Sequence, residues 1–212
     1  MELPLIYLFI ALLWILWCGL HSTLITKTVT DYAKNKLGYQ YRFYRLFFNT
    51  ISLITFIPLL YYSISYRGPL VFGWEGSLMI VKYFLLAMSI YLFIAGARHY
   101  SMSQFIGIHQ IKTGQTDQTL SENNTFNISG ILSVIRHPWY TSGIMIIWSG
   151  DIYLSNLLNN IVISIYFVVG AFLEERKLLL EFGDKYREYQ KNVSMLIPYK
   201  WLRTKIAGLF QT

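Results

Sequence analysis

The sequence predicts an all-α integral membrane protein with about five transmembrane helices, a C-terminal helical hairpin and a cytoplasmic amphipathic helix. Three observations lead to this prediction. Of the 212 residues, 54% are hydrophobic and only 14% are charged, whereas a soluble domain carries roughly 25% charged residues. The apolar residues are bunched into long runs. The lysines and arginines gather between particular runs.

Three apolar runs are long enough to cross a bilayer as helices, namely residues 3–25, 43–65 and 78–97. The only Lys, Arg, Asp or Glu in them are Arg45 in the second run and Lys82 in the third. A bilayer core about 30 Å thick needs about 20 helical residues. No basic segment precedes the first run, so we expect a retained helix there and not a cleaved signal peptide.

Two later apolar runs, residues 139–154 and 157–173, are shorter, and the first of them contains Asp151. The polar pair Ser155 and Asn156 between them is typical of a tight turn. We therefore expect a helical hairpin here. The alternative is a pair of helices that cross the membrane only in part.

The basic residues predict the orientation. With five helices, sixteen of the eighteen lysines and arginines fall on one side of the membrane, and only Arg67 and Lys82 fall on the other. By the positive-inside rule the first side is cytoplasmic. The net charge of +7 is then mainly a topology signal, and nucleic-acid binding is not expected because the basic residues flank helices and do not form one patch.

Ionisable side chains collect at the predicted cytoplasmic helix ends. They are His21, Arg45, Arg98 with His99, Arg136 with His137, and Glu174 with Glu175. Such groups are costly near the membrane and by default face a bundle interior or a cavity. The alternative is that each caps a helix or extends to the lipid headgroups.

Pro138 suits the first turn of a helix, where its missing N–H would be unpaired in any case. The helix that begins there presents free N–H groups and a positive dipole end. His137 and Tyr140 share one face of it, and Gly143 permits close approach of another helix or a flat ligand. This start could hold the carboxylate or adenine of a cofactor.

The chain after residue 173 predicts two more helices. Apolar and aromatic residues recur every three or four positions from Leu178 to Val193, which is typical of an amphipathic helix. A second, interfacial helix with Trp201 and several basic residues is expected after it. The polar segment 101–129 is long for a connection, so it is either a lid over a cytoplasmic pocket or a plain solvated loop.

Two linked C-terminal motifs are similar to those of a known superfamily. The first is Arg136-His137-Pro138-x-Tyr140, with Gly143 one position later than the family glycine and Ser142 in its place. The second begins at Glu174-Glu175, includes Tyr186, and ends at Ile197-Pro198. Together they resemble the isoprenylcysteine carboxyl methyltransferase-like membrane methyltransferases. The resemblance implies a single membrane methyltransferase domain that binds S-adenosylmethionine.

The resemblance also implies a layout: three N-terminal transmembrane helices in residues 1–100, a cytoplasmic loop at 101–135, a cofactor-binding hairpin and helix at 136–198, and an interfacial tail at 199–212. The cofactor residues that it implies share the two motifs. They are Arg136, His137, Pro138, Tyr140, Gly143, Glu174, Glu175 and Tyr186.

Shorter N-terminal motifs resemble the branch that contains methanethiol S-methyltransferases and NnrU-like proteins. They are Trp17-Cys18-Gly19-Leu20-His21-Ser22, Tyr44-Arg45-x-x-x-Asn49 and Phe105-x-Gly107-x-x-Gln110. This branch implies a small thiol as methyl acceptor. Because a thiol attacks as the thiolate, a histidine or nearby cation is expected to remove or offset the proton, and the candidates are His21 first, then Arg45 and His99. The stretch 168–173 lacks the arginine that carboxyl methyltransferases carry, which disfavours a carboxylate acceptor.

The sequence leaves two alternatives to a thiol methyltransferase. One is an isoprenylcysteine carboxyl or lipid amine methyltransferase, and the other is a non-catalytic NnrU-like sensor or partner-binding protein. The expected partners are a small or lipid-soluble acceptor and membrane lipids, with no protein partner. A single cysteine and four scattered histidines give no recognisable metal site. The expected location is the inner or cytoplasmic membrane, with the active site facing the cytoplasm.

Overall fold

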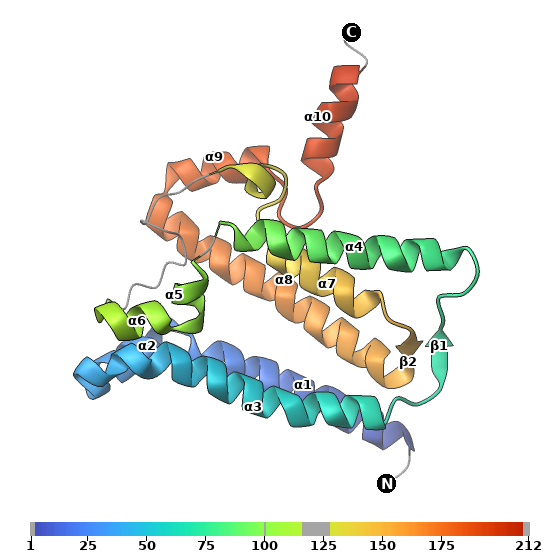
Figure 1. The fold of residues 1–212 in the computed structure, drawn as a ribbon, viewed down its shortest axis with the longest axis horizontal. Helices are drawn as coiled ribbons and strands as arrows, with labels where there is room; N and C mark the ends of the chain where they lie inside the picture. Colours follow the sequence, from blue (N-terminus) through green and yellow to red (C-terminus); the bar gives the residue numbers. More distant parts are fainter. Residues whose placement is uncertain (1–2, 100, 116–127, 210–212) are drawn as a thin grey trace. The chain divides into compact units, whose positions relative to one another are not determined.

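The computed structural model describes residues 3–99, 101–115 and 128–209. Apart from two short strands, its elements are helices (Figure 1). In chain order they are α1 (Leu3–Leu24), α2 (Lys27–Leu37), the 3-10 helix η1 (Gly38–Phe43), α3 (Tyr44–Ser65), β1 (Leu70–Phe72), α4 (Leu78–Ala97), α5 (Met102–Ile106), α6 (Ile108–Thr113), the 3-10 helix η3 (Gly130–Ser133), α7 (Pro138–Trp148), β2 (Ile152–Tyr153), α8 (Leu154–Phe182), α9 (Asp184–Asn192) and α10 (Tyr199–Leu209).

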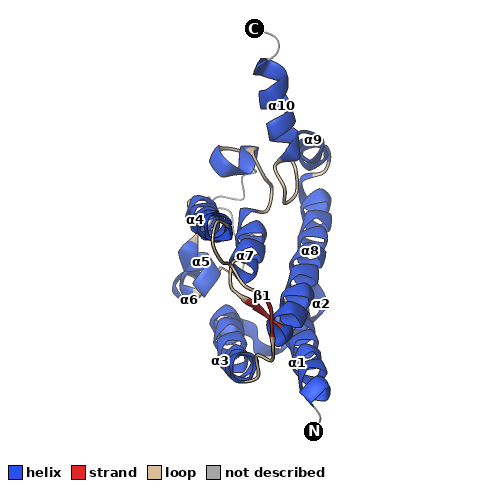
Figure 2. Cartoon of the chain, turned by 90° about the vertical axis from the view of Figure 1, so that its right-hand side faces the viewer, coloured by secondary structure: helices blue, strands red, loops and turns tan. Residues whose placement is uncertain are grey.

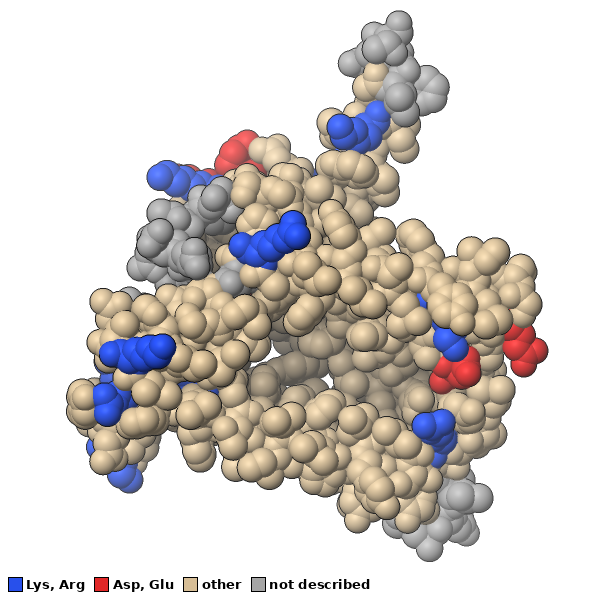
Figure 3. Space-filling model, in the orientation of Figure 1, with Lys and Arg blue, Asp and Glu red and all other residues tan. Residues whose placement is uncertain are grey.

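Four helical segments are long and apolar enough to cross a membrane, by length and composition. They are Leu5–Leu24, Lys27–Ser65, Leu78–Ala97 and Leu154–Phe182. Wide stretches of the molecular surface accordingly carry neither basic nor acidic side chains (Figure 3). The three N-terminal predicted helices are confirmed within one residue at each end. α7, with 11 residues, is shorter than the roughly 20 that a crossing needs, so the count of five spans stays a prediction.

The chain divides into two compact units. The first unit contains residues 1–73, 100–122 and 151–163. Its apolar core is centred on Ile10, Trp14 and Leu59. Ser63 of α3 links three helices, because its hydroxyl accepts hydrogen bonds from Trp14 Nε1 at 2.9 Å and from Asn159 Nδ2 at 3.1 Å. Such buried polar bonds join helices where the surroundings are uniformly apolar.

The second unit contains residues 74–99, 123–150 and 164–212. In it α4 and α7 lie side by side in both views (Figures 1 and 2). The hydroxyl of Ser142 donates to the carbonyl of Ser89 at 2.9 Å, and the Ser89 hydroxyl bonds the Ser142 carbonyl at 3.0 Å. These small residues let the two helices pack closely. A second core forms where Tyr186, Tyr189 and Val193 pack together, as the amphipathic pattern predicts.

The turn predicted at Ser155–Asn156 is wrong. Both residues lie in the first turn of α8, and the chain reverses earlier, between Trp148 and Leu154. β2 pairs there with β1 in an antiparallel two-stranded sheet that the sequence did not predict. Ser155 is fully buried at this helix start, where its backbone N–H donates to the carbonyl of Arg67 and its hydroxyl accepts from Asn159 Nδ2 at 3.5 Å.

Two further boundaries differ from the prediction. The segment 101–129 is not a plain loop throughout, because α5 and α6 form in its first half. The rest of the predicted lid, residues 116–127, lies outside the described residues. The helix of residues 157–173 continues without a break to Phe182, so Glu174 and Glu175 lie within α8 and do not close it. The amphipathic helix expected from Leu178 to Val193 is divided at Gly183 between α8 and α9.

Candidate functional site

The start of α7 is fixed by main-chain bonds to the segment that follows α9. Pro138 is the first helical residue and His137 precedes it as N-cap. The N–H groups of Arg136 and His137 donate to the carbonyls of Ser194 at 2.9 Å and Met195 at 3.1 Å. These bonds hold two distant parts of the chain, the two C-terminal motifs, against each other.

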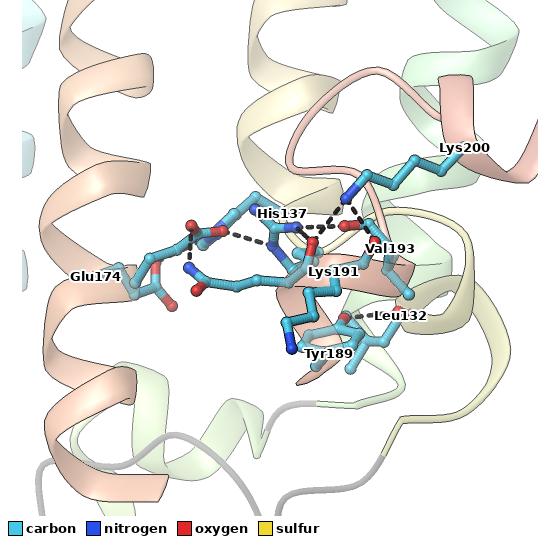
Figure 4. A network of polar contacts seen from close by, with 10 residues as sticks. Leu132, His137, Glu174, Tyr189, Lys191, Val193 and Lys200 are labelled. Atoms are coloured by element: carbon cyan, nitrogen blue, oxygen red, sulfur yellow. Dashed lines mark hydrogen bonds and ion pairs between the residues drawn. The ribbon is translucent and has the colours of Figure 1, made fainter. Parts of the chain in front are cut away.

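A buried ionic network centred on Glu175 forms beside this start. Its Oε1 accepts from Arg136 Nε at 2.6 Å and from His137 Nε2 at 3.1 Å. Its Oε2 accepts from Gln190 Nε2 at 2.7 Å. The side chain of Glu175 is only 7% exposed, so its charge is stabilised almost wholly by these protein donors. Figure 4 shows the network.

Arg136 ties the same network to the end of α9. Its guanidinium donates to the carbonyl of Gln190 at 3.1 Å and also to that of Val193. Removing one partner of such a buried pair leaves an uncompensated charge, which is strongly destabilising. The Glu175 network therefore holds the start of α7, the C-terminal half of α8 and the end of α9 together.

Glu174, the next residue along α8, has different surroundings. Its side chain is 38% exposed, and its Oε2 lies 3.6 Å from His137 Nδ1. His137 thus contacts a carboxylate at each of its two ring nitrogens. The half-exposed carboxylate of Glu174 retains room to accept hydrogen bonds from a ligand.

An aromatic stack extends from His137 along α7 toward α8. The ring of Tyr140 stacks on His137 at a centroid distance of 5.4 Å and on Phe167 at 5.7 Å. A Cβ at Gly143 would lie 2.7 Å from the Phe167 ring. The small size of Gly143 therefore serves the contact between α7 and α8, which is one of the two roles that its position predicted.

Tyr186 of α9 lies in the apolar core that it forms with Tyr189 and Val193, and it is 1% exposed. Burial raises the pKa of its phenol, and the nearby charge of Glu175 raises it further. Burial likewise raises the pKa of Tyr189, whose hydroxyl donates to the carbonyl of Leu132 at 2.6 Å. Both phenols stay neutral at ordinary pH and act as packing and hydrogen-bonding groups.

The eight predicted cofactor residues thus all fall in the second unit. Hydrogen bonds, ion pairs and ring contacts join five of them, namely Arg136, His137, Tyr140, Glu174 and Glu175. The three predicted acceptor-activating residues are divided between the units. His21 and Arg45 belong to the first, and His99 belongs to the second, where its Nε2 would lie 3.0 Å from a Cβ at Gly130.

In the first unit, His21 and Arg45 both have protein partners. The Nδ1 of His21 lies 3.0 Å from the Ser52 hydroxyl, and its ring stacks on Trp17 at 5.0 Å. The Nε of Arg45 donates to the carbonyl of Phe105 at 3.1 Å, and Asn49 Nδ2 donates to the same carbonyl at 2.9 Å. Two of the short N-terminal motifs therefore meet at the C-terminal end of α5.

Sequence reasoning missed Gln190 and Lys200. Gln190 follows Tyr189 in α9 and contributes both an amide donor and a carbonyl acceptor to the Glu175 network. The Nζ of Lys200 donates to the carbonyls of Gln190 at 2.7 Å and Lys191 at 2.8 Å. The position of Lys200 two residues after Pro198, at the start of a helix, was the one available signal.

Fold and site together define an all-α membrane protein in which an arginine–glutamate–histidine network orders the start of one helix beside a half-exposed carboxylate. A family model described as NnrU protein matches residues 8–196. The chain belongs to this NnrU family.

Curated relatives of the chain are named methanethiol S-methyltransferase. Methanethiol S-methyltransferase 1 of Bradyrhizobium diazoefficiens is 36% identical over 101 residues, which cover 46% of this chain and 34% of that protein. The Pseudomonas deceptionensis enzyme is 36% identical over 77 residues, or 36% of this chain and 29% of the relative. The Mycobacterium tuberculosis enzyme is 36% identical over 66 residues, or 31% and 27%. The matches span about a third of the length of these relatives. No solved structure matches the chain.

Proposed function

We propose that this protein is an S-adenosylmethionine-dependent methyltransferase of the cytoplasmic membrane face, with a small thiol such as methanethiol as the favoured acceptor. The observation that carries the proposal is the half-exposed carboxylate of Glu174 beside the ordered start of α7. The names of the relatives support the same reaction class.

The residues at this site suit the chemistry of the donor. The α7 start offers N–H groups and a positive dipole end for a carboxylate. The carboxylate of Glu174 can accept hydrogen bonds from two ribose hydroxyls. When bound, S-adenosylmethionine supplies a methyl group that needs no further chemical activation.

Within the site we assign different roles to the two glutamates. Glu175 is fully bonded to protein donors, so it positions His137 and Arg136. Glu174 would contact the donor. His137 and Tyr140 line the site, while Pro138, Gly143 and Tyr186 maintain its shape.

The acceptor side requires removal of a thiol proton, because a thiolate is the reactive nucleophile. A histidine can take that proton, and a nearby cation can stabilise the resulting anion. We propose His21 first for the proton, with Arg45 and His99 as the other two groups able to stabilise or accept charge. Because the protein mainly supplies proximity and orientation, no metal is required.

The experiment is headspace detection of dimethyl sulfide from methanethiol and S-adenosylmethionine with the purified full chain. Parallel reactions contain an isoprenylcysteine analogue or a lipid amine and a labelled methyl donor. Dimethyl sulfide supports the proposal. Label in one of the other acceptors alone would overturn the thiol assignment, and label in none with no donor binding would favour a non-catalytic sensor.

A further inference from the structure

The C-terminal helix α10 has an exposed apolar face. Tyr199, Leu202 and Ile206 follow a helical spacing on one side, and each is between 45% and 59% exposed. Trp201 adds a further aromatic ring that is 41% exposed. Buried helices do not leave this much apolar surface open, so α10 is built to contact something apolar.

The charges of α10 are of a single sign. Lys200, Arg203 and Lys205 lie within its eleven residues, and the helix contains no Asp or Glu. Figure 3 likewise shows basic and no acidic side chains on the visible face of α10. The Nζ of Lys205 lies 5.9 Å from the Trp201 ring centroid. An apolar face bordered by lysine, arginine and tryptophan matches the interface of a bilayer with anionic headgroups.

The first turn of α10 is also bonded to residues of the Glu175 network, which belongs to the site proposed for the methyl donor. Lys200 Nζ caps the C-terminal end of α9 through the carbonyls of Gln190 and Lys191 (Figure 4). The Gln190 carbonyl also accepts from Arg136, and the Gln190 side chain donates to Glu175. The Lys200 backbone N–H donates to the hydroxyl of Ser194 at 3.1 Å. The position of α10 is therefore coupled to the Glu175 network through one side chain and one backbone bond.

We propose that α10 lies in the membrane surface, with its apolar face among the lipids and Arg203 and Lys205 at anionic headgroups. This membrane contact keeps Lys200 bonded to the carbonyls of Gln190 and Lys191, beside the Glu175 network. The surface contact stands independently of the proposed function, whereas its effect on donor affinity rests on it. Anionic lipid would thus order the donor site.

The contact is tested in the full chain reconstituted into vesicles. An environment-sensitive fluorophore is attached at Ile206→Cys in a Cys18→Ala background, since Cys18 is the only cysteine. Vesicles contain phosphatidylcholine alone or mixed with phosphatidylglycerol. We expect quenching by a spin label at a shallow depth on the lipid chains, and stronger quenching in the anionic vesicles.

Charge variants test the partner. Each basic side chain near an anionic surface changes the equilibrium by about fivefold, so Arg203→Gln with Lys205→Gln should abolish the difference between the two vesicles. The control is Lys185→Gln with Arg187→Gln, which removes the same charge from the exposed side of α9. This control should keep most of the difference in quenching between the two vesicle types. Quenching by aqueous iodide alone, or protection from both quenchers through contact with protein, would overturn the proposal.

The coupling is tested by binding of S-adenosylhomocysteine to the same preparations. Lys200→Met should weaken binding severalfold and speed hydrogen exchange of the last turn of α9, while Lys200→Arg should restore both in part. Unchanged affinity and exchange in Lys200→Met would overturn the coupling. If no preparation binds S-adenosylhomocysteine, the proposed function fails, while the quenching result still decides where α10 lies.

Discussion

Glu174 and Glu175 are adjacent in the sequence but have opposite surroundings. We predict that Glu174→Gln weakens the binding of S-adenosylmethionine by at least tenfold and leaves thermal stability nearly unchanged, because its carboxylate is half exposed. We predict that Glu175→Gln lowers both, because it removes a buried charge that Arg136 and His137 require. Affinity and melting temperature are measured side by side.

Glu181→Gln is the control for these variants, since Glu181 is an exposed glutamate further along α8. It should alter neither quantity. If Glu175→Gln lost stability but bound the donor normally, the network would serve only to join the helices. If Glu174→Gln bound the donor normally, the assignment of Glu174 would be wrong.

His21 allows a second test at the level of one side chain. We predict that His21→Ala slows thiol methylation by about 10²–10⁴-fold, the usual contribution of a general base, and leaves donor binding intact. The loss should shrink as the pH rises, because the thiol then ionises without help. Rates are compared from neutral to alkaline pH.

The structural alternative for His21 is its hydrogen bond to Ser52. Ser52→Ala removes that bond and keeps the imidazole, so it serves as the matched control. An equal, pH-independent loss in both variants would show that His21 only joins α1 to α3.

The sequence predicted which side chains gather at this site better than it predicted the hydrogen bonds between them. The two C-terminal motifs have distinctive residue types and spacing, and the structure brings Arg136, His137, Tyr140, Glu174 and Glu175 of the eight predicted residues into contact. That these residues bind the methyl donor stays a prediction. The motifs did not predict that Gln190 and Lys200 complete the site. Main-chain carbonyls do much of the bonding there, and residue identity carries no signal for a carbonyl acceptor.

Among the helices, the contact between α7 and α8 depends on Gly143. We predict that Gly143→Ala destabilises the protein by about 1–3 kcal/mol, because the new methyl group overlaps Phe167. Phe167→Leu in the same chain should recover part of this loss by making room. Thermal unfolding in detergent measures both variants.

Gly150→Ala provides the control, since a Cβ there meets nothing within 4 Å. It should leave stability within about 0.5 kcal/mol of the parent. A stable Gly143→Ala that no longer bound the donor would instead place a ligand at this glycine.

The helix boundaries show where sequence reasoning works for elements. The long apolar runs fixed α1, α3 and α4 because hydrophobic length is a direct consequence of bilayer thickness. The sequence placed the chain reversal at Ser155 because this residue is polar. In the structure Ser155 is buried, with its backbone N–H bonded to the carbonyl of Arg67 and its hydroxyl bonded to Asn159. Polarity alone does not separate a turn from a buried helix start.

For the whole molecule, the distribution of basic residues predicts an N-terminus outside and a C-terminus inside the cytoplasm. Reporter fusions after Thr212 and in the loop 67–76 check this prediction. We expect a cytoplasmic signal from the first and an external signal from the second. A cytoplasmic signal from the loop fusion would refute the predicted orientation, and an external signal from the fusion after Thr212 would refute a crossing by the short α7.

Whether this protein binds a methyl donor is measured by equilibrium binding of labelled S-adenosylmethionine to the purified full chain, with competition by S-adenosylhomocysteine and by ATP. We expect saturable binding at one site per chain, displaced by S-adenosylhomocysteine and not by ATP, because only the former carries the amino-acid carboxylate that we propose to bind at the start of α7. Absence of saturable binding to folded protein, in detergent and in anionic vesicles alike, would contradict it.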